Sequence, residues 1–193
     1  MNLLNFEPVK RIAACKIYLI LLVGIFCTGF FFCFFVEICD DSPYYGLIRL
    51  YEIYTVDFNA SYILIKLLCD FLVLLLILFS GQIIYTLPLH FVIILYKGFI
   101  FGITVRILVS AYFAGGILVS AVIIIPSCAI SVCGYMALSC FCYHSFFKCD
   151  SLKLKNLKCI ICDFLLCMSI CVVALLIEFI ISVILVRPLN YYF

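Results

Sequence analysis

The chain has 193 residues, of which 69% are hydrophobic and 11% are charged. A soluble domain is about 45–50% apolar and about 25% charged, because its surface must be hydrated. The high hydrophobicity excludes an intrinsically disordered chain, and a formal net charge of only +2 gives no reason to expect nucleic acid as a partner. The composition therefore indicates a protein that crosses a membrane several times.

The apolar runs of this sequence are unbroken, whereas the strands of a membrane barrel alternate apolar and polar residues. We therefore expect an all-α polytopic integral membrane protein. Each crossing needs about 20 predominantly apolar residues, so that every backbone N–H and C=O is satisfied within its own helix. The chain has room for about five such helices.

The first predicted transmembrane helix covers residues 17–36 and follows a basic segment, residues 1–16. Its apolar run is longer than the roughly 7–15 residues of a signal-peptide core, and no small-x-small cleavage site follows it. We therefore expect an uncleaved anchor. The main polar stretch, residues 37–66, holds five acids and two bases and is predicted to form an extracytoplasmic loop.

Residues 67–147 are almost continuously apolar and long enough for transmembrane helices 2–4. Proline and paired glycines are the residues most able to end a helix here, which makes Pro88 and the pair Gly115-Gly116 the best candidates. The predicted spans are then about 67–87, 88–109 and 117–136.

The distribution of basic residues predicts the orientation, because Lys and Arg concentrate in cytoplasmic loops. Residues 1–16 contain three bases and the basic loop 148–158 contains four. Both segments are cytoplasmic if five helices cross from a cytoplasmic N-terminus, with a fifth helix at 159–186 and an extracytoplasmic tail at 187–193. A four-span alternative would make residues 88–110 re-entrant or would place the lysine-rich loop outside.

Ionisable residues within the predicted spans are candidates for function, since a charge at mid-bilayer costs on the order of 3 kcal/mol. At a rise of about 1.5 Å per residue, two of them, Asp70 and Arg106, are expected at a similar level near the outer interface, where they could form an ion pair. His90 and Asp163 are expected near the cytoplasmic face, where they could bond to each other. The full set is Asp70, His90, Lys97, Arg106, Asp163 and Glu178.

Lys97 stands apart, because it is expected about 14 Å from the inner face with no acid assigned to its depth. It would have to reach Asp163, find backbone carbonyls or a cavity, or lose its proton. Gly98 and Gly102 beside it form a G-x-x-x-G spacing, which lets a neighbouring helix approach closely.

Most of the 14 cysteines lie in apolar spans, where Cys behaves as a small hydrophobic residue. Cys159-x-x-Cys162, with Cys149 and His144 nearby, has partial zinc-ligand character. Only one CxxC is present, so we expect neither a metal site nor a cofactor. The sequence also lacks G-x-S-x-G, H-E-x-x-H and a Gly-rich phosphate loop.

The stretch Lys97-Gly-Phe-Ile-Phe-Gly-Ile-Thr-Val-Arg-Ile-Leu-Val, followed by Gly115-Gly-Ile-Leu and by Val122-Ile-Ile-Ile-Pro126, resembles the stage II sporulation protein M family. That family has a K-G-F-x-x-G-F-T-V-G-F-L-V type of stretch before a G-x-L-L turn and a hydrophobic run that ends in Pro. The resemblance covers about residues 70–147 and points to a set of helix-packing or interaction residues. These are Lys97, Gly98, Phe101, Gly102, Gly115, Gly116 and Pro126.

Two positions depart from the family pattern. Arg106 stands where the family commonly has Gly, and Ser127-Cys128 follow Pro126 where a Gln-Asn pair is typical. These departures put in doubt the local packing and any contact that the Gln-Asn pair makes.

The resemblance implies a scaffold in the cell membrane that is not itself an enzyme. In endospore-forming bacteria, members of this family anchor two peptidoglycan-degrading partners, stage II sporulation proteins D and P, during engulfment. The expected partners are therefore the lipid bilayer and membrane-anchored hydrolases similar to these two.

Two hypotheses from other classes stay open beside the scaffold. One is a small permease or transport-complex subunit, in which Lys97, Arg106 and Glu178 line a pathway for an anion or a proton. The other is an intramembrane enzyme that uses Asp70, His90 or Asp163.

Overall fold

The computed structural model describes residues 7–35, 60–81, 84–148 and 155–189, and every regular element in them is helical. Short 3₁₀ turns follow α2 and precede α5, and a π-helical turn joins α5 to α6. The helices are α1 (Glu7–Ala14), α2 (Lys16–Phe32), α4 (Ala60–Ser80), α5 (Pro88–Val119), α6 (Ile125–Lys148) and α7 (Lys155–Leu189).

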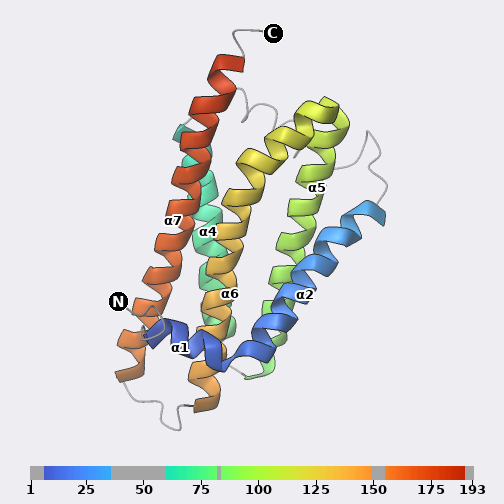
Figure 1. The fold of residues 1–193 in the computed structure, drawn as a ribbon. Coiled ribbons are helices and arrows are strands. Elements are labelled where there is room, and N and C mark those ends of the chain that lie inside the picture. Colours follow the sequence, from blue (N-terminus) through green and yellow to red (C-terminus); the bar gives the residue numbers. More distant parts are fainter. Residues whose placement is uncertain (1–6, 36–59, 82–83, 149–154, 190–193) are drawn as a thin grey trace.

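Within the described residues, five helices are long and apolar enough to cross a membrane. This confirms the prediction of an all-α, multi-pass membrane protein. α5 runs through the bundle as one continuous helix (Figure 1), which disagrees with a re-entrant segment at residues 88–110. The five spans are Lys16–Phe35, Ile63–Ser80, Pro88–Ile107, Ile125–Ser145 and Ile160–Ile181.

The course of the chain agrees with the alternation that five spans require. Figure 1 shows α1, the end of α6 and the start of α7 at one end of the bundle, while the end of α2 and the start of α4 lie at the other. The two basic segments, residues 1–16 and 148–158, therefore flank helix ends on the same side. That this side faces the cytoplasm stays a prediction from the distribution of Lys and Arg.

Several helix boundaries differ from the predicted ones, most clearly those of α4 and α5. α4 occupies Ala60–Ser80 rather than residues 67–87, so part of the predicted outer loop is helical. α5 begins at Pro88, as predicted, but its helical hydrogen bonding continues through Gly115-Gly116 to Val119, and a π-helical turn at Ser120–Ile124 leads into α6. The two glycines therefore do not end the helix.

Pro126 is the second residue of α6 rather than the end of an apolar run within a span. It follows closely on the π-helical turn Ser120–Ile124, and proline, which lacks the N–H of a regular helical hydrogen bond, is a common cause of such an irregularity. The sequence therefore contained a better signal for the start of this span than the two glycines did.

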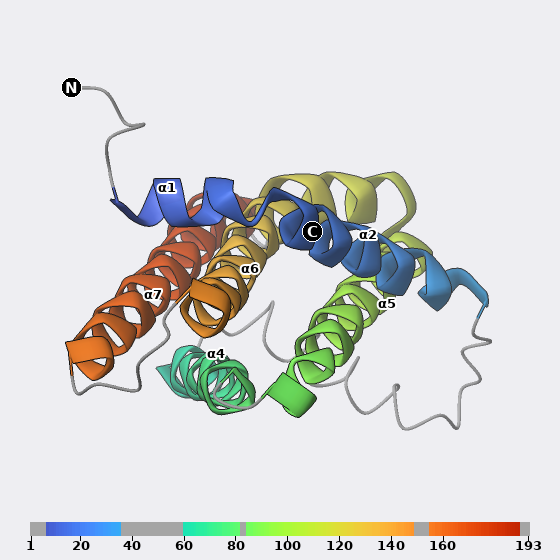
Figure 2. The same ribbon diagram turned by 90° about the horizontal axis from the view of Figure 1, so that it is seen from below.

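α6 is the central helix of the fold. Of its span, 61% is buried inside the protein, against 22–28% for the other four spans. Seen along the bundle, α6 lies among the other helices (Figure 2), and it packs on α7, α4 and α1. We call α4, α6 and α7 the α6 group.

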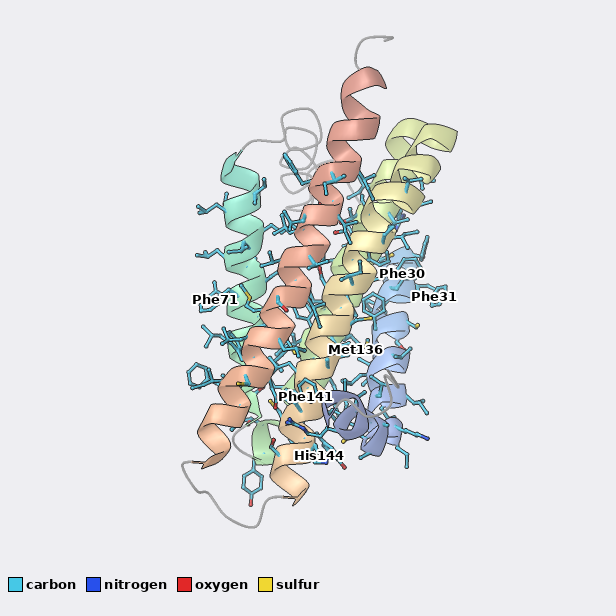
Figure 3. The ribbon with its side chains drawn as sticks, turned by 60° about the vertical axis from the view of Figure 1, so that its left-hand side comes forward. Phe30, Phe31, Phe71, Met136, Phe141 and His144 are labelled. Carbon is cyan, nitrogen blue, oxygen red and sulfur yellow. The ribbon has the colours of Figure 1, made fainter. Side chains whose placement is uncertain are left out.

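α2 packs mainly along α5, and these two helices form the second part of the bundle, the α2–α5 pair. α2 is tilted away from the other helices toward its end (Figure 1). Several apolar side chains of α2 and of the 3₁₀ turn after it are exposed, including Phe31 at 61% and Phe35 at 83%. Figure 3 shows Phe30 and Phe31 on this outer part of the bundle. A face of this kind meets lipid or another membrane helix.

Candidate functional site in the middle of the bundle

Asp70 of α4, Lys97 of α5 and Tyr135 of α6 meet inside the bundle and form what we call the central cluster. The Tyr135 hydroxyl donates a hydrogen bond to Asp70 Oδ1. Lys97 Nζ lies 3.6 Å from the same carboxylate oxygen and donates to the Tyr135 hydroxyl at 3.4 Å. It also lies 5.0 Å from the centroid of the Tyr135 ring. The ion pair between Asp70 and Lys97 and the hydroxyl of Tyr135 thus join α4, α5 and α6.

The central cluster lies near the middle of the membrane spans. Asp70 comes 7 residues after the start of its span, Lys97 comes 9 and Tyr135 comes 10, counted from Ile63, Pro88 and Ile125. At about 1.5 Å per residue these steps correspond to about 10, 14 and 15 Å, and the hydrocarbon core is about 30 Å thick. All three side chains therefore leave the backbone at a similar, central depth.

The prediction that Lys97 has no acid at its depth is wrong. α4 begins earlier than predicted, so Asp70 lies deeper than the third residue of its helix and reaches the level of Lys97. The predicted pair of Asp70 with Arg106 does not form. Arg106 instead donates to the Cys33 carbonyl oxygen at 2.8 Å and ties α5 to the end of α2.

The two oxygens of the Asp70 carboxylate have different surroundings. Oδ1 receives the Tyr135 hydroxyl and faces the Lys97 ammonium group. Oδ2 is buried and, among the described residues, is the buried side-chain polar atom that has no hydrogen-bond partner. Asp70 is only 4% exposed, and such an orphaned atom costs about 1–3 kcal/mol. One oxygen of the carboxylate thus has partners, and the other has none among the described residues.

A second polar group links α4, α6 and α7 nearer to the end at which α4 begins. Lys66 and Ser127 both donate to Glu178 Oε2, and Glu178 is 3% exposed. The position of Glu178 near the end of its span agrees with the prediction. Lys66 was expected to close the outer loop, but it belongs to α4.

His90 and Asp163 were expected near the cytoplasmic face, either solvated or bonded to each other, but both are buried and each has other partners. His90 Nδ1 lies 2.9 Å from the Tyr18 hydroxyl, and His90 Nε2 lies 3.0 Å from the Ile77 carbonyl oxygen. Asp163 accepts a hydrogen bond from Arg11 Nη1 at 2.7 Å. The contacts of His90 on α5 thus link α2 and α4 to α5, and the ion pair of Asp163 links α1 to α7.

The guanidinium of Arg11 also lies over the ring of Phe141, 5.6 Å from its centroid. Figure 3 shows Phe141 on α6 at the end of the bundle where α1 crosses. α1 is thereby attached to both α6 and α7. The basic N-terminal segment thus supplies a structural ion pair in addition to its predicted role in orientation.

Sequence reasoning missed Tyr135, the residue that completes the central cluster. Its signal was a period of four on α6, where polar side chains recur on one face of an otherwise apolar helix. All four members of this stripe are buried, and the hydroxyls of Ser131 and Ser139 donate to backbone carbonyls one turn earlier. The stripe consists of Ser127, Ser131, Tyr135 and Ser139.

Gly98 and Gly102, the glycines of the family-like stretch, pack against α2. A Cβ at Gly98 would meet the carbonyl oxygen of Phe26, and a Cβ at Gly102 would lie 2.6 Å from that of Phe30. Gly29 of α2 makes the reciprocal approach to α5. The ring of Phe101 lies 6.0 Å from that of Phe26 and 5.5 Å from that of Phe30, measured between centroids. We call this contact the glycine seam.

The zinc-like cysteine pattern is only partly within the described residues. Cys162 is exposed, while Cys149 and the side chain of Cys159 lie outside them. The described part of the chain contains no group of three or more His, Cys, Asp or Glu side chains that could hold a metal ion. The absence of a metal site from the whole chain therefore stays a prediction.

The sequence matches no known family model, and comparison with curated proteins and with solved structures gives no significant match. The fold and the composition identify a polytopic membrane protein with five candidate spans. A more specific function has to be argued from the residues themselves.

Proposed function

We propose that this chain is a non-catalytic membrane scaffold similar to the stage II sporulation protein M family, and that it anchors or recruits peptidoglycan-degrading partners. The observation that carries the proposal is the use of the family-like stretch within the fold. Gly98 and Gly102 bring the backbone of α5 against that of α2. A motif of small and apolar residues used in this way maintains the shape of the molecule and supplies no reactive group.

The interhelical polar contacts support a scaffold because they fix how the helices sit against each other. The central cluster joins α4, α5 and α6, Glu178 joins α7 to α4 and α6, and Arg11 joins α1 to α7. Polar side chains bonded across helices contribute to association inside a bilayer, where the hydrophobic effect does not. A bundle held in this way presents a constant outer surface to its partners.

The outer face of α2 is the surface that we assign to a membrane-anchored partner. α2 lies at the edge of the bundle (Figure 2) and packs mainly on α5, so its opposite side faces outward. The proposed partners are hydrolases similar to stage II sporulation proteins D and P, each with its own membrane anchor. A further contact is proposed in the outer loop through Arg49, Glu52 and Asp57, which lie outside the described residues.

Co-purification tests the proposal. An affinity-tagged chain, extracted in mild detergent from membranes of a sporulating bacterium, is expected to retain peptidoglycan hydrolases that zymography and mass spectrometry detect. The chain purified without partners is expected to leave peptidoglycan intact. Cleavage by the partner-free chain would overturn the proposal, and so would a tagged chain that retains no hydrolase.

The central cluster favours one second candidate, a small permease or a subunit of a transport complex. Secondary transporters place their binding sites near the bilayer midplane, and Asp70, Lys97 and Tyr135 meet at that depth. Proteoliposomes with an entrapped pH-sensitive dye separate the two candidates. A permease is supported if protons enter the vesicles and the Lys97→Ala variant abolishes this entry. The scaffold is supported if protons enter no faster than they enter protein-free vesicles.

A further inference from the structure

The orphaned oxygen of Asp70 is a buried feature that the proposed scaffold does not use. Asp70 is 4% exposed, and its Oδ2 has no partner among the described residues, whereas Oδ1 has two neighbours that carry protons. A buried oxygen without a donor is rare in folded proteins and calls for a specific reason. The missing donor at Oδ2 is the starting point of the inference.

We propose that Asp70 is a proton-binding site in the middle of the membrane, and that Oδ2 is the atom that gains and loses the proton. A proton needs only one lone pair. A metal ion would need several oxygen ligands and would be repelled by the ammonium group of Lys97, which lies 3.6 Å from Oδ1. The proposal requires neither transport nor hydrolase binding, so it is tested independently of both.

The cluster can accommodate the proton because each of its groups keeps a partner afterwards. When Oδ2 is protonated, Oδ1 still accepts the hydrogen bond of Tyr135. Lys97 then loses its ionic partner but keeps the Tyr135 hydroxyl at 3.4 Å and the face of the ring at 5.0 Å. An ammonium group over an aromatic face is stabilised by the ring quadrupole. Both protonation states are therefore supported by the same three side chains.

Titratable groups face Asp70 from each helix packed around it. Lys97 comes from α5 and Tyr135 from α6, and the thiols of Cys128 on α6 and Cys171 on α7 are near enough to interact with its charge. On α4 itself, Lys66 lies one turn away and is held by Glu178. These are the groups that surround the proposed proton site on Asp70.

Lys97 is less covered by the surrounding helices than Asp70 is. The side chain of Lys97 is 23% exposed, whereas that of Asp70 is 6% exposed. Charged side chains at this depth face the bundle interior or a water-filled cavity rather than lipid. We expect a proton to enter and leave at the exposed edge of Lys97.

Dicyclohexylcarbodiimide is the chemical probe for the proton, because this apolar reagent adds to protonated carboxyl groups buried in membranes and leaves a stable N-acylurea. The full chain in phosphatidylcholine vesicles is treated between about pH 5 and about pH 9, a range that covers shifted carboxyl groups, and the adducts are mapped by mass spectrometry. We expect an adduct on Asp70 that decreases as the pH rises. Its absence at every pH would overturn the proposal.

The reactivity of the reagent also changes with pH, so the variant Lys97→Gln supplies the control. Without the ammonium group the neutral carboxyl is less disfavoured, and labelling of Asp70 is expected to persist to a proton concentration at least tenfold lower. Lys66→Gln, whose charge is paired with Glu178, is expected to move the profile less. Equal profiles for the wild type and Lys97→Gln would contradict the assignment.

Infrared difference spectra between low and high pH give a readout that needs no reagent. The carbonyl stretch of a protonated carboxyl group is expected in the wild type, absent in Asp70→Asn and retained in Asp163→Asn. Asn keeps an oxygen that can accept the hydrogen bond of Tyr135, and circular dichroism verifies the fold of each variant. A spectrum that Asp70→Asn leaves unchanged would place the proton elsewhere and overturn the proposal.

Discussion

The α2–α5 pair and the α6 group are held together in different ways. The glycine seam brings two backbones into contact, because Gly29, Gly98 and Gly102 leave no side chain between them. In the α6 group, hydrogen bonds and ion pairs cross between helices, with Asp70 joined to Tyr135 and Glu178 to Lys66. Lipid removes the hydrophobic drive for helix association, so close packing and polar contacts must replace it. Close backbone packing is most prominent in the α2–α5 pair and polar contacts are most prominent in the α6 group, although Arg106 and His90 of α5 also bond to α2 or to the turn after it.

The largest effect is expected where a polar contact joins the two parts. Lys97→Met leaves the Asp70 carboxylate buried without a counter-charge, which costs about 3–5 kcal/mol in the free energy of unfolding. The variant can relieve this cost by binding a proton in the folded state, so its stability is expected to rise as the pH falls. Unfolding in detergent micelles at several pH values, followed by circular dichroism, measures both effects.

The double variant Lys97→Met/Asp70→Asn is the control for this prediction. It removes both charges at once, and its loss of stability is expected to be smaller than that of Lys97→Met and nearly independent of pH. If the single and the double variant were equally unstable at every pH, the two parts of the bundle would not be coupled through this ion pair.

A smaller effect is expected at the glycine seam. In Gly29→Ala the new Cβ meets the carbonyl oxygen of Leu95, and forcing the helices apart costs about 1–3 kcal/mol. Gly24, on the same helix, has open space around its Cβ position, so Gly24→Ala is the matched control. Alanine favours the helix there by up to about 1 kcal/mol. Thermal unfolding in the same detergent compares the two variants. Equal stabilities would contradict the prediction that close backbone contact at the glycine seam stabilises the α2–α5 pair.

The same contrast explains which features could be predicted from the sequence. The glycine spacing at Gly98 and Gly102 was visible because both residues lie on one helix and the period of four is local. The number of spans was likewise predictable, because the length of each span follows from membrane thickness and the apolar stretches together have room for five. Both signals need only neighbouring residues.

The polar contacts could not be predicted in this way, because each depends on the relative depth of two helices. The predicted start of α4 was seven residues too late, which shifted the predicted depth of Asp70 by about 10 Å. Asp70 was therefore placed at the level of Arg106 instead of at the level of Lys97. Tyr18 and Tyr135 were overlooked because a tyrosine in an apolar run is typical of membrane interfaces as well. Only the packing of the helices shows which polar group each phenol meets.

The smallest effect is expected at a contact where both kinds of packing occur together. Tyr18 of α2 stacks on Tyr143 of α6 with ring centroids 4.4 Å apart, and its hydroxyl lies 2.9 Å from His90 Nδ1 of α5. Tyr18→Phe keeps the ring and removes only the hydrogen bond, so it should cost about 0.5–1.5 kcal/mol. Tyr96→Phe is the control, because Tyr96 is 59% exposed and its hydroxyl should contribute little. A loss at Tyr18 no larger than that at Tyr96 would show that the hydrogen bond between Tyr18 and His90 adds nothing to the stability of the α2–α5 pair, and that Tyr18 contributes through the stacking of its ring alone.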